Sequence, residues 1–229
     1  MPAALSDRLT KAASMVAPCD TVADIGADHA LLSIFLLEQG RCRTGLCTDK
    51  SRAPLKKART ALTARGLAER CEFLLGDGLL VLEGCSVDTV VIAGLGGDTI
   101  RDILSVDPAH LQNRSFVLQP MSKHTSLRLC LSRIGFCVQE EVLAEDGGRI
   151  YPILRVFYDG IPRKSAPLEL LCGRQNLLRR DATTLRYLRG LSLSLTRRVE
   201  GRRAAGLDTA AEQKLLSALN DHLNTQEAP

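Results

Sequence analysis

The sequence predicts a doubly wound α/β sheet followed by a basic helical region. Residues 21–30, TVADIGADHA, form a short apolar run that breaks at Gly26 and leads into an apolar segment of helical length. The most strand-like run, residues 88–93, is almost wholly apolar and stops at a group of glycines, as a central parallel strand does. From about residue 167, leucines recur at helical spacing with arginines between them.

The other elements follow from the same periodicities and from chain-breaking residues. Residues 5–16 indicate an amphipathic helix that begins near Ser6 and ends before Pro18. The remaining expected elements are strands at 21–25, 44–48, 71–75, 88–93 and 115–118, helices at 30–39, 53–65, 98–104 and 123–134, and a hairpin of strands 136–144 and 149–157 around a turn at 145–148. Five parallel strands followed by an antiparallel pair are typical of class I, Rossmann-like methyltransferases rather than of dehydrogenases.

The C-terminal region is expected to form an antiparallel helical pair or coiled coil. Its leucine-rich runs are separated by breaks at Gly201 and Gly206, and they comprise Leu168, Leu171, Leu178, Leu185 and Leu188, then Ala211, Leu215, Leu216, Leu219 and Leu223. We therefore divide the chain into a catalytic and cofactor-binding domain, residues 1–160, and a helical appendage, residues 161–229.

Composition excludes several classes of protein. The 229 residues suffice for one full α/β domain and a smaller appendage. No apolar run approaches the length of a membrane span, and the N-terminus lacks a signal pattern, so we expect a cytoplasmic protein without membrane contact. The eight cysteines form no C-x-x-C pair and the histidines do not cluster, which favours free thiols over a metal site.

Charge is distributed unevenly along the chain. The net charge is +4, but residues 163–203 contain eleven basic and three acidic side chains and so carry +8. A near-neutral body with a basic appendage is typical of nucleic-acid binders. We expect Arg179, Arg180, Arg197 and Arg198 to contact nucleic acid; the alternative is an ordinary solvated helix face.

The turn after the first strand carries two acids. Asp24 ends the strand, Gly26 lets the backbone approach a ligand closely, and Asp28 and His29 precede the helix. A pyrophosphate would need amide donors here, so the acids favour a cationic or amine-bearing ligand, such as the sulfonium and amino groups of S-adenosylmethionine. The alternative is that Asp28 only N-caps the helix while Asp24 ends the strand.

Later strands also end at acids or glycines. Asp49, 25 residues after Asp24, suits a ribose diol, although it could instead cap the following helix. Asp77 and the Gly78 amide suit an adenine, although Gly-Asp-Gly is also an ordinary turn. We expect the glycines in residues 94–97 (GLGG), at the end of the central strand, to leave room for a ligand and not to serve packing.

Together these motifs resemble the bacterial tRNA (adenine-22 N1)-methyltransferases, the TrmK family. The resemblance covers most of the chain and rests on residues 24–30 (DIGADHA), Asp49, 76–78 (GDG), 93–97 (AGLGG), 118–120 (LQP) and 149–151 (RIY). The family usually has tyrosine and proline where Leu31 and Ser33 stand, and it tends to have methionine at Leu95 and asparagine at Met121. These departures leave the details of base recognition open.

The resemblance implies methyl transfer from S-adenosylmethionine to N1 of an adenine in the D-arm of tRNA, with the helical region helping to hold the tRNA. The cofactor residues would be Asp24, Gly26, His29, Asp49, Asp77, Gly78 and Gly94. Adenine N1 already carries a lone pair, so no base is needed. The catalytic residues would be Asp28, which could stabilise charge on the ring, and Gln119; either could accept a hydrogen bond from the exocyclic amine.

Other interpretations remain open at this stage. Arg8 could reach the rim of the pocket or be an exposed helix charge, and His29 is assigned no acid–base work. We expect a monomer. The competing functions are methylation of another RNA position, a non-catalytic RNA-binding protein that retains the fold, and a small-molecule methyltransferase whose helical tail mediates dimerisation.

Overall fold

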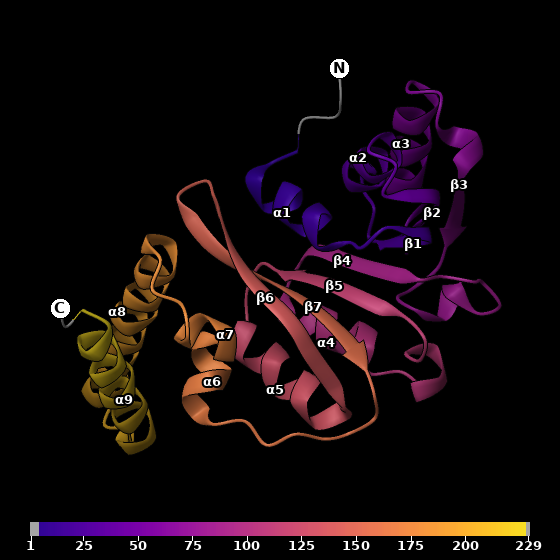
Figure 1. Cartoon of the computed structure of the whole chain (residues 1–229). Coiled ribbons are helices and arrows are strands. Elements are labelled where there is room, and N and C mark those ends of the chain that lie inside the picture. The colour runs from indigo at the N-terminus through magenta and orange to yellow at the C-terminus, as the bar shows by residue number, and fades with distance from the viewer. Residues whose placement is uncertain (1–4, 228–229) are drawn as a thin grey trace. The chain divides into compact units, whose positions relative to one another are not determined.

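A computed structural model describes residues 5–227 (Figure 1). The chain divides into two compact units, Met1–Arg163 and Lys164–Pro229. Within the described residues, no helix combines the length and apolar character needed to cross a bilayer. All eight cysteines are free thiols, three of them buried and five half-buried.

The first unit contains a seven-stranded sheet in the order β3-β2-β1-β4-β5-β7-β6 (Figure 1). Its strands are β1 (Cys19–Ile25), β2 (Cys42–Asp49), β3 (Cys71–Leu75), β4 (Thr89–Leu95), β5 (Ser115–Pro120), β6 (Phe136–Asp146) and β7 (Arg149–Tyr158). The first five strands pair in parallel, and β7 pairs antiparallel with both β5 and β6. The predicted fold class is confirmed. The strand order reverses at β1, which pairs with both β2 and β4.

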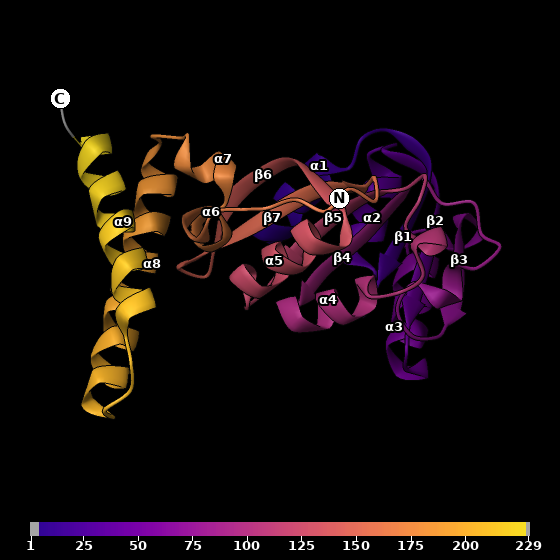
Figure 2. The same ribbon diagram turned by 90° about the horizontal axis from the view of Figure 1, so that it is seen from below.

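Helices cover both faces of this sheet (Figure 2). They are α1 (Asp7–Met15), α2 (Leu31–Glu38), α3 (Arg52–Thr63), α4 (Gly97–Leu104) and α5 (His124–Ile134), with short 3₁₀ turns at Ala68–Arg70, Leu80–Leu82 and Pro108–His110. Alternate residues of the central strands supply two separate cores: Val91 packs with residues of α1, α2 and α3, whereas Val90 and Ile92 pack with residues of α4 and α5. This two-sided burial explains why β4 is continuously apolar.

The hairpin turn is tighter than expected. β6 continues to Asp146 and β7 begins at Arg149, so only Gly147 and Gly148 form the turn, with φ of 56° and 72°. Two successive positive φ values are typical of a type I′ turn, which matches the twist of the flanking strands. As a result Asp146 belongs to the strand end and not to a loop.

The expectation that the glycines after β4 serve only a ligand is wrong for Gly97. A β-carbon on Gly97 would lie 2.5 Å from the Ser122 carbonyl oxygen and 2.8 Å from that of Lys123. The Gly97 amide also donates to the Ser122 carbonyl at 2.9 Å. Gly97 therefore permits close packing of the start of α4 against the loop that follows β5. Gly94, with φ of 80°, is the glycine that faces the cleft described below.

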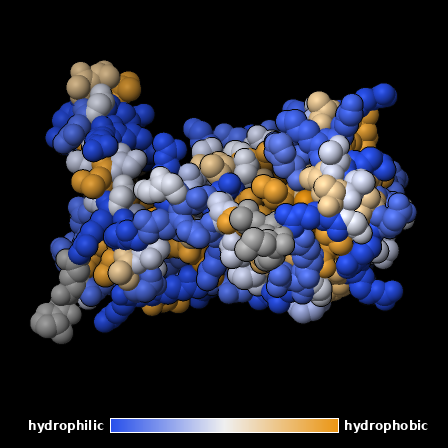
Figure 3. All heavy atoms as spheres, turned by 90° about the horizontal axis from the view of Figure 1, so that it is seen from above, coloured by the Kyte–Doolittle hydropathy of each residue, from blue (hydrophilic) through white to orange (hydrophobic). Residues whose placement is uncertain are grey.

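The second unit is wholly helical. Its helices are α6 (Pro167–Cys172), α7 (Arg174–Leu177), α8 (Ala182–Ala204) and α9 (Ala210–Glu227), with α8 and α9 packed side by side (Figures 1 and 2). The buried apolar side chains of these two helices are Tyr187, Leu188, Leu195 and Val199 from α8 and Leu219 and Leu223 from α9. On the face in Figure 3, much of this pair is covered by hydrophilic side chains.

The helical pair was predicted correctly, but its limits were not. Gly201 lies inside α8 and does not interrupt it. Leu178 is 77% exposed between α7 and α8, so the first leucine run belongs to several helices and not to one stripe. Asp181 marks the true start of α8, because its side chain accepts a hydrogen bond of 2.9 Å from the Thr184 amide.

Candidate active site

A cleft of about 580 Å³ lies at the carboxyl ends of β1, β2 and β4. It is lined by Arg8, Leu9, Asp24, Gly26, Ala27, Asp28, His29, Ala30, Leu31, Leu32, Asp49, Pro54, Ala93, Gly94 and Leu95. The strand order reverses here, and this is where open α/β sheets bind their ligands. Asp77 and Gly78 follow β3 at the same edge of the sheet but do not line the cleft.

The backbone of the first turn is fixed by β2. The Gly26 and Ala27 amides both donate to the Thr48 carbonyl, at 2.9 and 3.1 Å, and Gly26 has a φ of 78°. The residue at the N-cap of α2 is Ala30, in a left-handed conformation and without a capping side chain. The alternative interpretation, in which Asp28 caps this helix, is therefore wrong.

Asp24 is a buried acid at the base of the cleft. Only 6% of the residue is exposed, and its Oδ2 accepts a hydrogen bond of 2.9 Å from the Ser33 hydroxyl. The Cys47 thiol lies 3.5 Å from the same hydroxyl and can donate to it. Burial raises the pKa of Asp24 to about 6, and the bond from Ser33 opposes that rise. A cationic group in the cleft would stabilise this carboxylate.

Arg8 is a cleft residue that sequence reasoning left undecided. Its Nε donates to Asp146 Oδ2 at 3.3 Å, its Nη1 donates to Gln119 Oε1, and its side chain is only 16% exposed. The guanidinium carbon lies 6.0 Å from the ring centroid of Tyr151. The alternative of an exposed helix charge is wrong. The sequence did contain one signal for this position: Arg8 precedes the fully buried Ala12 by one helical turn, so the two residues lie on the same face of the helix.

Gln119 is completely buried beneath the cleft. Its Oε1 accepts hydrogen bonds from the Gly94 amide, at 3.0 Å, and from Arg8. Its Nε2 donates to the Pro120 carbonyl at 3.0 Å. An amide oxygen has two lone pairs, so Gln119 can accept a bond from a base only if Arg8 moves away. In this arrangement Gln119 positions Gly94 and Arg8.

Asp28 and His29 lie at the mouth of the cleft. His29 Nε2 is 3.4 Å from Asp28 Oδ2, and Lys57 Nζ, from α3, is 3.6 Å from Asp28 Oδ1. All three side chains are more than half exposed, so solvent screens these pairs. Lys57 was not anticipated, because it is distant in sequence and lies on another helix.

Asp49 lines the cleft, and the alternative in which it caps α3 is wrong, because Ser51 is the N-cap residue of that helix. Its Oδ1 accepts a hydrogen bond of 2.8 Å from the Ser51 amide, just before α3 begins. The Asp49 carbonyl also accepts from the Gly76 amide at 3.0 Å, which ties the end of β2 to the segment that contains Asp77.

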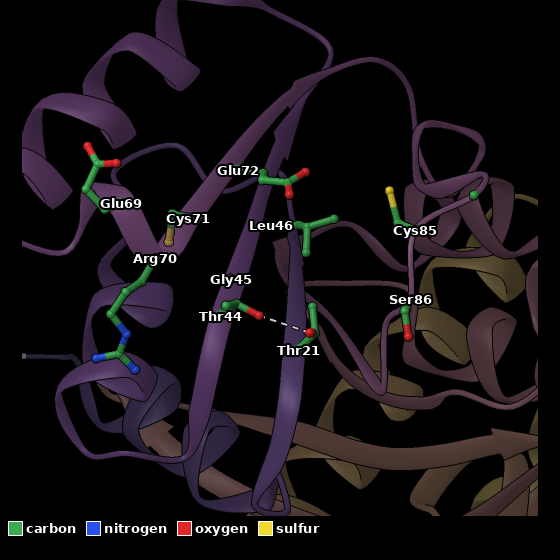
Figure 4. A pocket seen from close by; sticks show the side chains of 11 residues that line it. Thr21, Thr44, Gly45, Leu46, Glu69, Arg70, Cys71, Glu72, Cys85 and Ser86 are labelled. Carbon is green, nitrogen blue, oxygen red and sulfur yellow. Dashed lines mark hydrogen bonds between the residues drawn. The ribbon is translucent and has the colours of Figure 1, made fainter.

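A second hollow, of about 400 Å³, lies at the opposite, amino-terminal ends of β1, β2 and β3 (Figure 4). Figure 4 shows Cys85 and Ser86 facing it from a separate loop, and the Thr21 and Thr44 hydroxyls lie 3.0 Å apart. The guanidinium of Arg70 donates to main-chain carbonyls. None of the predicted site residues lines this hollow, so the cleft is the candidate active site. Residues 5–227 contain no cluster suited to a metal ion.

The family model described as "Methyltransferase domain" matches residues 5–154. The chain belongs to this methyltransferase family. The matched region includes β1 to β5, most of the hairpin, and every residue that lines the cleft.

Comparison with individual proteins shows which methyltransferases this chain resembles. It is 28% identical over 165 residues to the tRNA (adenine(22)-N(1))-methyltransferase of Bacillus subtilis, covering 69% of each chain. It is 36% identical over 135 residues to a putative tRNA methyltransferase of Mycoplasma pneumoniae, covering 58% of this chain and 61% of the relative. The structure of a putative tRNA (m1A22) methyltransferase from Streptococcus pneumoniae in complex with S-adenosyl-L-methionine is 26% identical and has a TM-score of 0.84, over 96% of this chain and all of the other. The resemblance to the TrmK family is thus confirmed.

Proposed function

We propose that the chain transfers a methyl group from S-adenosylmethionine to N1 of adenine 22 in the D-arm of tRNA. The observation that carries this proposal is the acid-lined cleft at the point where the strand order reverses. The neighbour from Streptococcus pneumoniae, which has the same fold over nearly the whole chain, is in complex with S-adenosyl-L-methionine.

The residues at the cleft fit this cofactor. A volume of about 580 Å³ is typical of a small-molecule site. Asp24 would bind the amino group, Asp49 the ribose hydroxyls, and Gly26 and Gly94 would let the backbone approach. His29 would contact the cofactor from the rim. Asp77 and Gly78 would bind the adenine of the cofactor. This requires the cofactor to extend past the cleft toward the end of β3.

When bound, the cofactor supplies an electrophilic methyl group, and the chain supplies position and electrostatics. Adenine N1 carries its own lone pair, so proximity and orientation, worth on the order of 7–11 kcal/mol, can provide most of the catalysis. Gly94 leaves room for a purine. Asp28, at the mouth, would stabilise the positive charge that develops on the ring and accept a hydrogen bond from the exocyclic amine.

The second unit would hold the tRNA through its phosphates. Arg180, Arg197 and Arg198 are exposed, and in residues 5–227 none of them makes an ion pair. Arg179 is half-buried; the hydrogen bond from the Thr184 amide is the main cause that lowers the pKa of Asp181, and the charge of Arg179 adds to it. Unpaired arginines neutralise phosphates without first breaking an internal contact. N1 lies on the pairing edge of adenine, so the target base must leave its stack before it reacts.

We also propose that the protein is a monomer. A tRNA substrate implies a cytoplasmic enzyme. Sedimentation velocity across a range of protein concentrations tests the oligomeric state, and a stable dimer would contradict it.

Methyl transfer from labelled S-adenosylmethionine to unmodified tRNA transcripts tests the function. We expect incorporation into a transcript with adenine at position 22, none when that base is changed to guanine, and 1-methyladenosine at this position by mass spectrometry. Methylation at another nucleotide would indicate a different RNA substrate. RNA binding with no uptake of the cofactor would indicate a non-catalytic protein, and methylation of small molecules alone would contradict the tRNA assignment.

A further inference from the structure

The segment that follows β2 concentrates positive charge on the surface of the first unit. Residues 50–67 contain six basic side chains and no acidic one, although residues 1–163 as a whole contain 19 of each kind and have no net charge. Five of the six are exposed on α3 or just before it, and we call them the α3 basic face: Lys50, Arg52, Lys56, Lys57 and Arg59. Such a surface suits a polyanion.

Most of these charges have no acidic partner. Lys57 Nζ lies 3.6 Å from Asp28 Oδ1, and both side chains are more than half exposed. Lys50, Arg52 and Lys56 make no ion pair within residues 5–227. An exposed cation without an internal partner can neutralise a phosphate at no cost to the fold.

The charges also lie at the end of α3 that disfavours them. The amino-terminal end of a helix carries a partial positive charge, so acids are favoured there and cations at the other end. The first turn of α3 contains no acid, and its last turn contains no basic residue. Arg52 and Lys56 are four residues apart, a spacing at which like charges repel each other. A bound anion would relieve both repulsions.

The α3 basic face begins at the rim of the cleft. Pro54, on α3, lines the cleft, and Lys57 reaches Asp28 at its mouth. The carboxylates of Asp24, Asp28 and Asp49 line the same cleft, so they repel the phosphates of an RNA whose base enters it. Cations at the rim can hold those phosphates outside the acidic cleft.

We propose that the α3 basic face binds the phosphates that flank the reacting nucleotide of the RNA substrate. This inference rests on the proposed function and adds to it a contact surface in the first unit. The base enters the cleft while its backbone stays at the rim, against Lys50, Arg52 and Lys56. These residues orient the substrate and do not contact the reacting atoms.

Filter binding to a tRNA transcript with adenine at position 22 tests this surface with two matched double variants. Arg52→Gln with Lys56→Gln removes two charges from the α3 basic face, and glutamine has a helix propensity close to theirs. Arg41→Gln with Arg43→Gln removes two charges that already have internal partners at the amino-terminal end of β2. At 0.1 M salt the α3 variant should bind about 30-fold more weakly, with a slope of log K against log salt concentration smaller by about 1.4–1.8. The control should stay within a few-fold of the wild-type protein.

Three further measurements locate the contact and exclude a structural cause. Ethylation of the phosphates beside the methylated nucleotide should interfere with binding to the wild-type protein, and this interference should disappear with the α3 variant. The melting temperature of the α3 variant should not fall, because the substitutions remove like charges from one end of a helix. Its affinity for S-adenosylmethionine by calorimetry should equal that of the wild-type protein.

The outcomes separate this inference from the proposed function. Wild-type affinity and salt slope in the α3 variant would overturn the inference and leave the proposed function standing. Equal losses in the two double variants, a lower melting temperature of the α3 variant, or interference only at phosphates remote from the methylated nucleotide would overturn it as well. If the wild-type protein methylated no tRNA, the proposed function would fail, and the inference with it.

Discussion

The Ser33 hydroxyl donates a hydrogen bond of 2.9 Å to the Asp24 carboxylate at the buried base of the cleft. The two residues come from α2 and β1, and both are less than 7% exposed. Burial alone would favour the neutral acid, and the Ser33 bond favours the carboxylate. A residue that departs from the usual pattern of the TrmK family thus supports the charge that a cationic ligand requires.

Ser33→Ala should move the acid limit of cofactor binding to higher pH. In the wild-type protein, affinity for S-adenosylmethionine should fall as pH drops through about 6, because Asp24 becomes protonated and no longer attracts the ammonium. Loss of the Ser33 bond should shift that midpoint upward by about one pH unit. Calorimetry between pH 5 and 7.5 measures it. Ser126→Ala, which removes a bond to Asp98, is the matched control, and coincident profiles for all three proteins would exclude the role of Ser33.

Asp24→Asn should abolish cofactor binding and yet stabilise the ligand-free protein above pH 6. The folded-state pKa of about 6 exceeds the ordinary value of 3.8, so the folded protein retains a proton that the unfolded chain releases. The stability from this group is complete below pH 3.8 and is lost as pH rises through about 6. The loss amounts to roughly 3 kcal/mol. Asparagine does not titrate and therefore avoids this loss.

Urea unfolding of both proteins at pH 4.5 and pH 8 measures this difference. The free energy of unfolding of Asp24→Asn relative to the wild-type protein should rise between the two pH values. A difference that is constant with pH would show that burial does not raise the pKa of Asp24 in the folded protein. Retained cofactor affinity in the variant would count against its role in binding.

Local patterns in the sequence were sufficient to predict the sheet and most helices. Apolar strands and the glycines and prolines between them are short-range signals, and the paired β6 and β7 strands were located within two residues at each end. These short-range signals could not reveal the contacts of Arg8, because Gln119 is 111 residues away in the sequence and Asp146 is 138 residues away. Such contacts depend on which strand ends the topology brings together, and no periodicity encodes that.

The same limit applies to residues whose role is set by a neighbour. Gly97 was interpreted as space for a ligand, because its contact with the loop after β5 is not visible in a glycine-rich motif. Ser33 was noted only as a departure, since its partner Asp24 is nine residues away, across the turn between β1 and α2. In the second unit, Gly201 suggested a break, but a single glycine is tolerated within a helix that packs along its length.

Gly97→Ala should destabilise the protein, whereas Gly96→Ala should be tolerated. The new methyl group at position 97 would meet backbone oxygens at 2.5 and 2.8 Å, so the loop after β5 would have to move. Overpacking of this kind costs on the order of 1–3 kcal/mol. At position 96 the nearest atom is the Ser122 hydroxyl at 3.4 Å, a side chain that can rotate. Thermal unfolding of the two variants compares them directly, and equal melting temperatures would contradict the packing role of Gly97.

Replacement of Arg179, Arg180, Arg197 and Arg198 together by alanine should weaken tRNA binding and leave cofactor binding unchanged. Each arginine that no longer neutralises a phosphate reduces the slope of log K against log salt concentration by about 0.7–0.9, so the fourfold variant should reduce it by roughly 3. Filter binding at several salt concentrations measures both the affinity and the slope. Arg202→Ala is a control from α8, the helix that also carries Arg197 and Arg198, because Arg202 is already paired with Glu212 and with the Asp208 carbonyl. If the fourfold variant kept the wild-type slope, the tRNA phosphates would have to contact another surface.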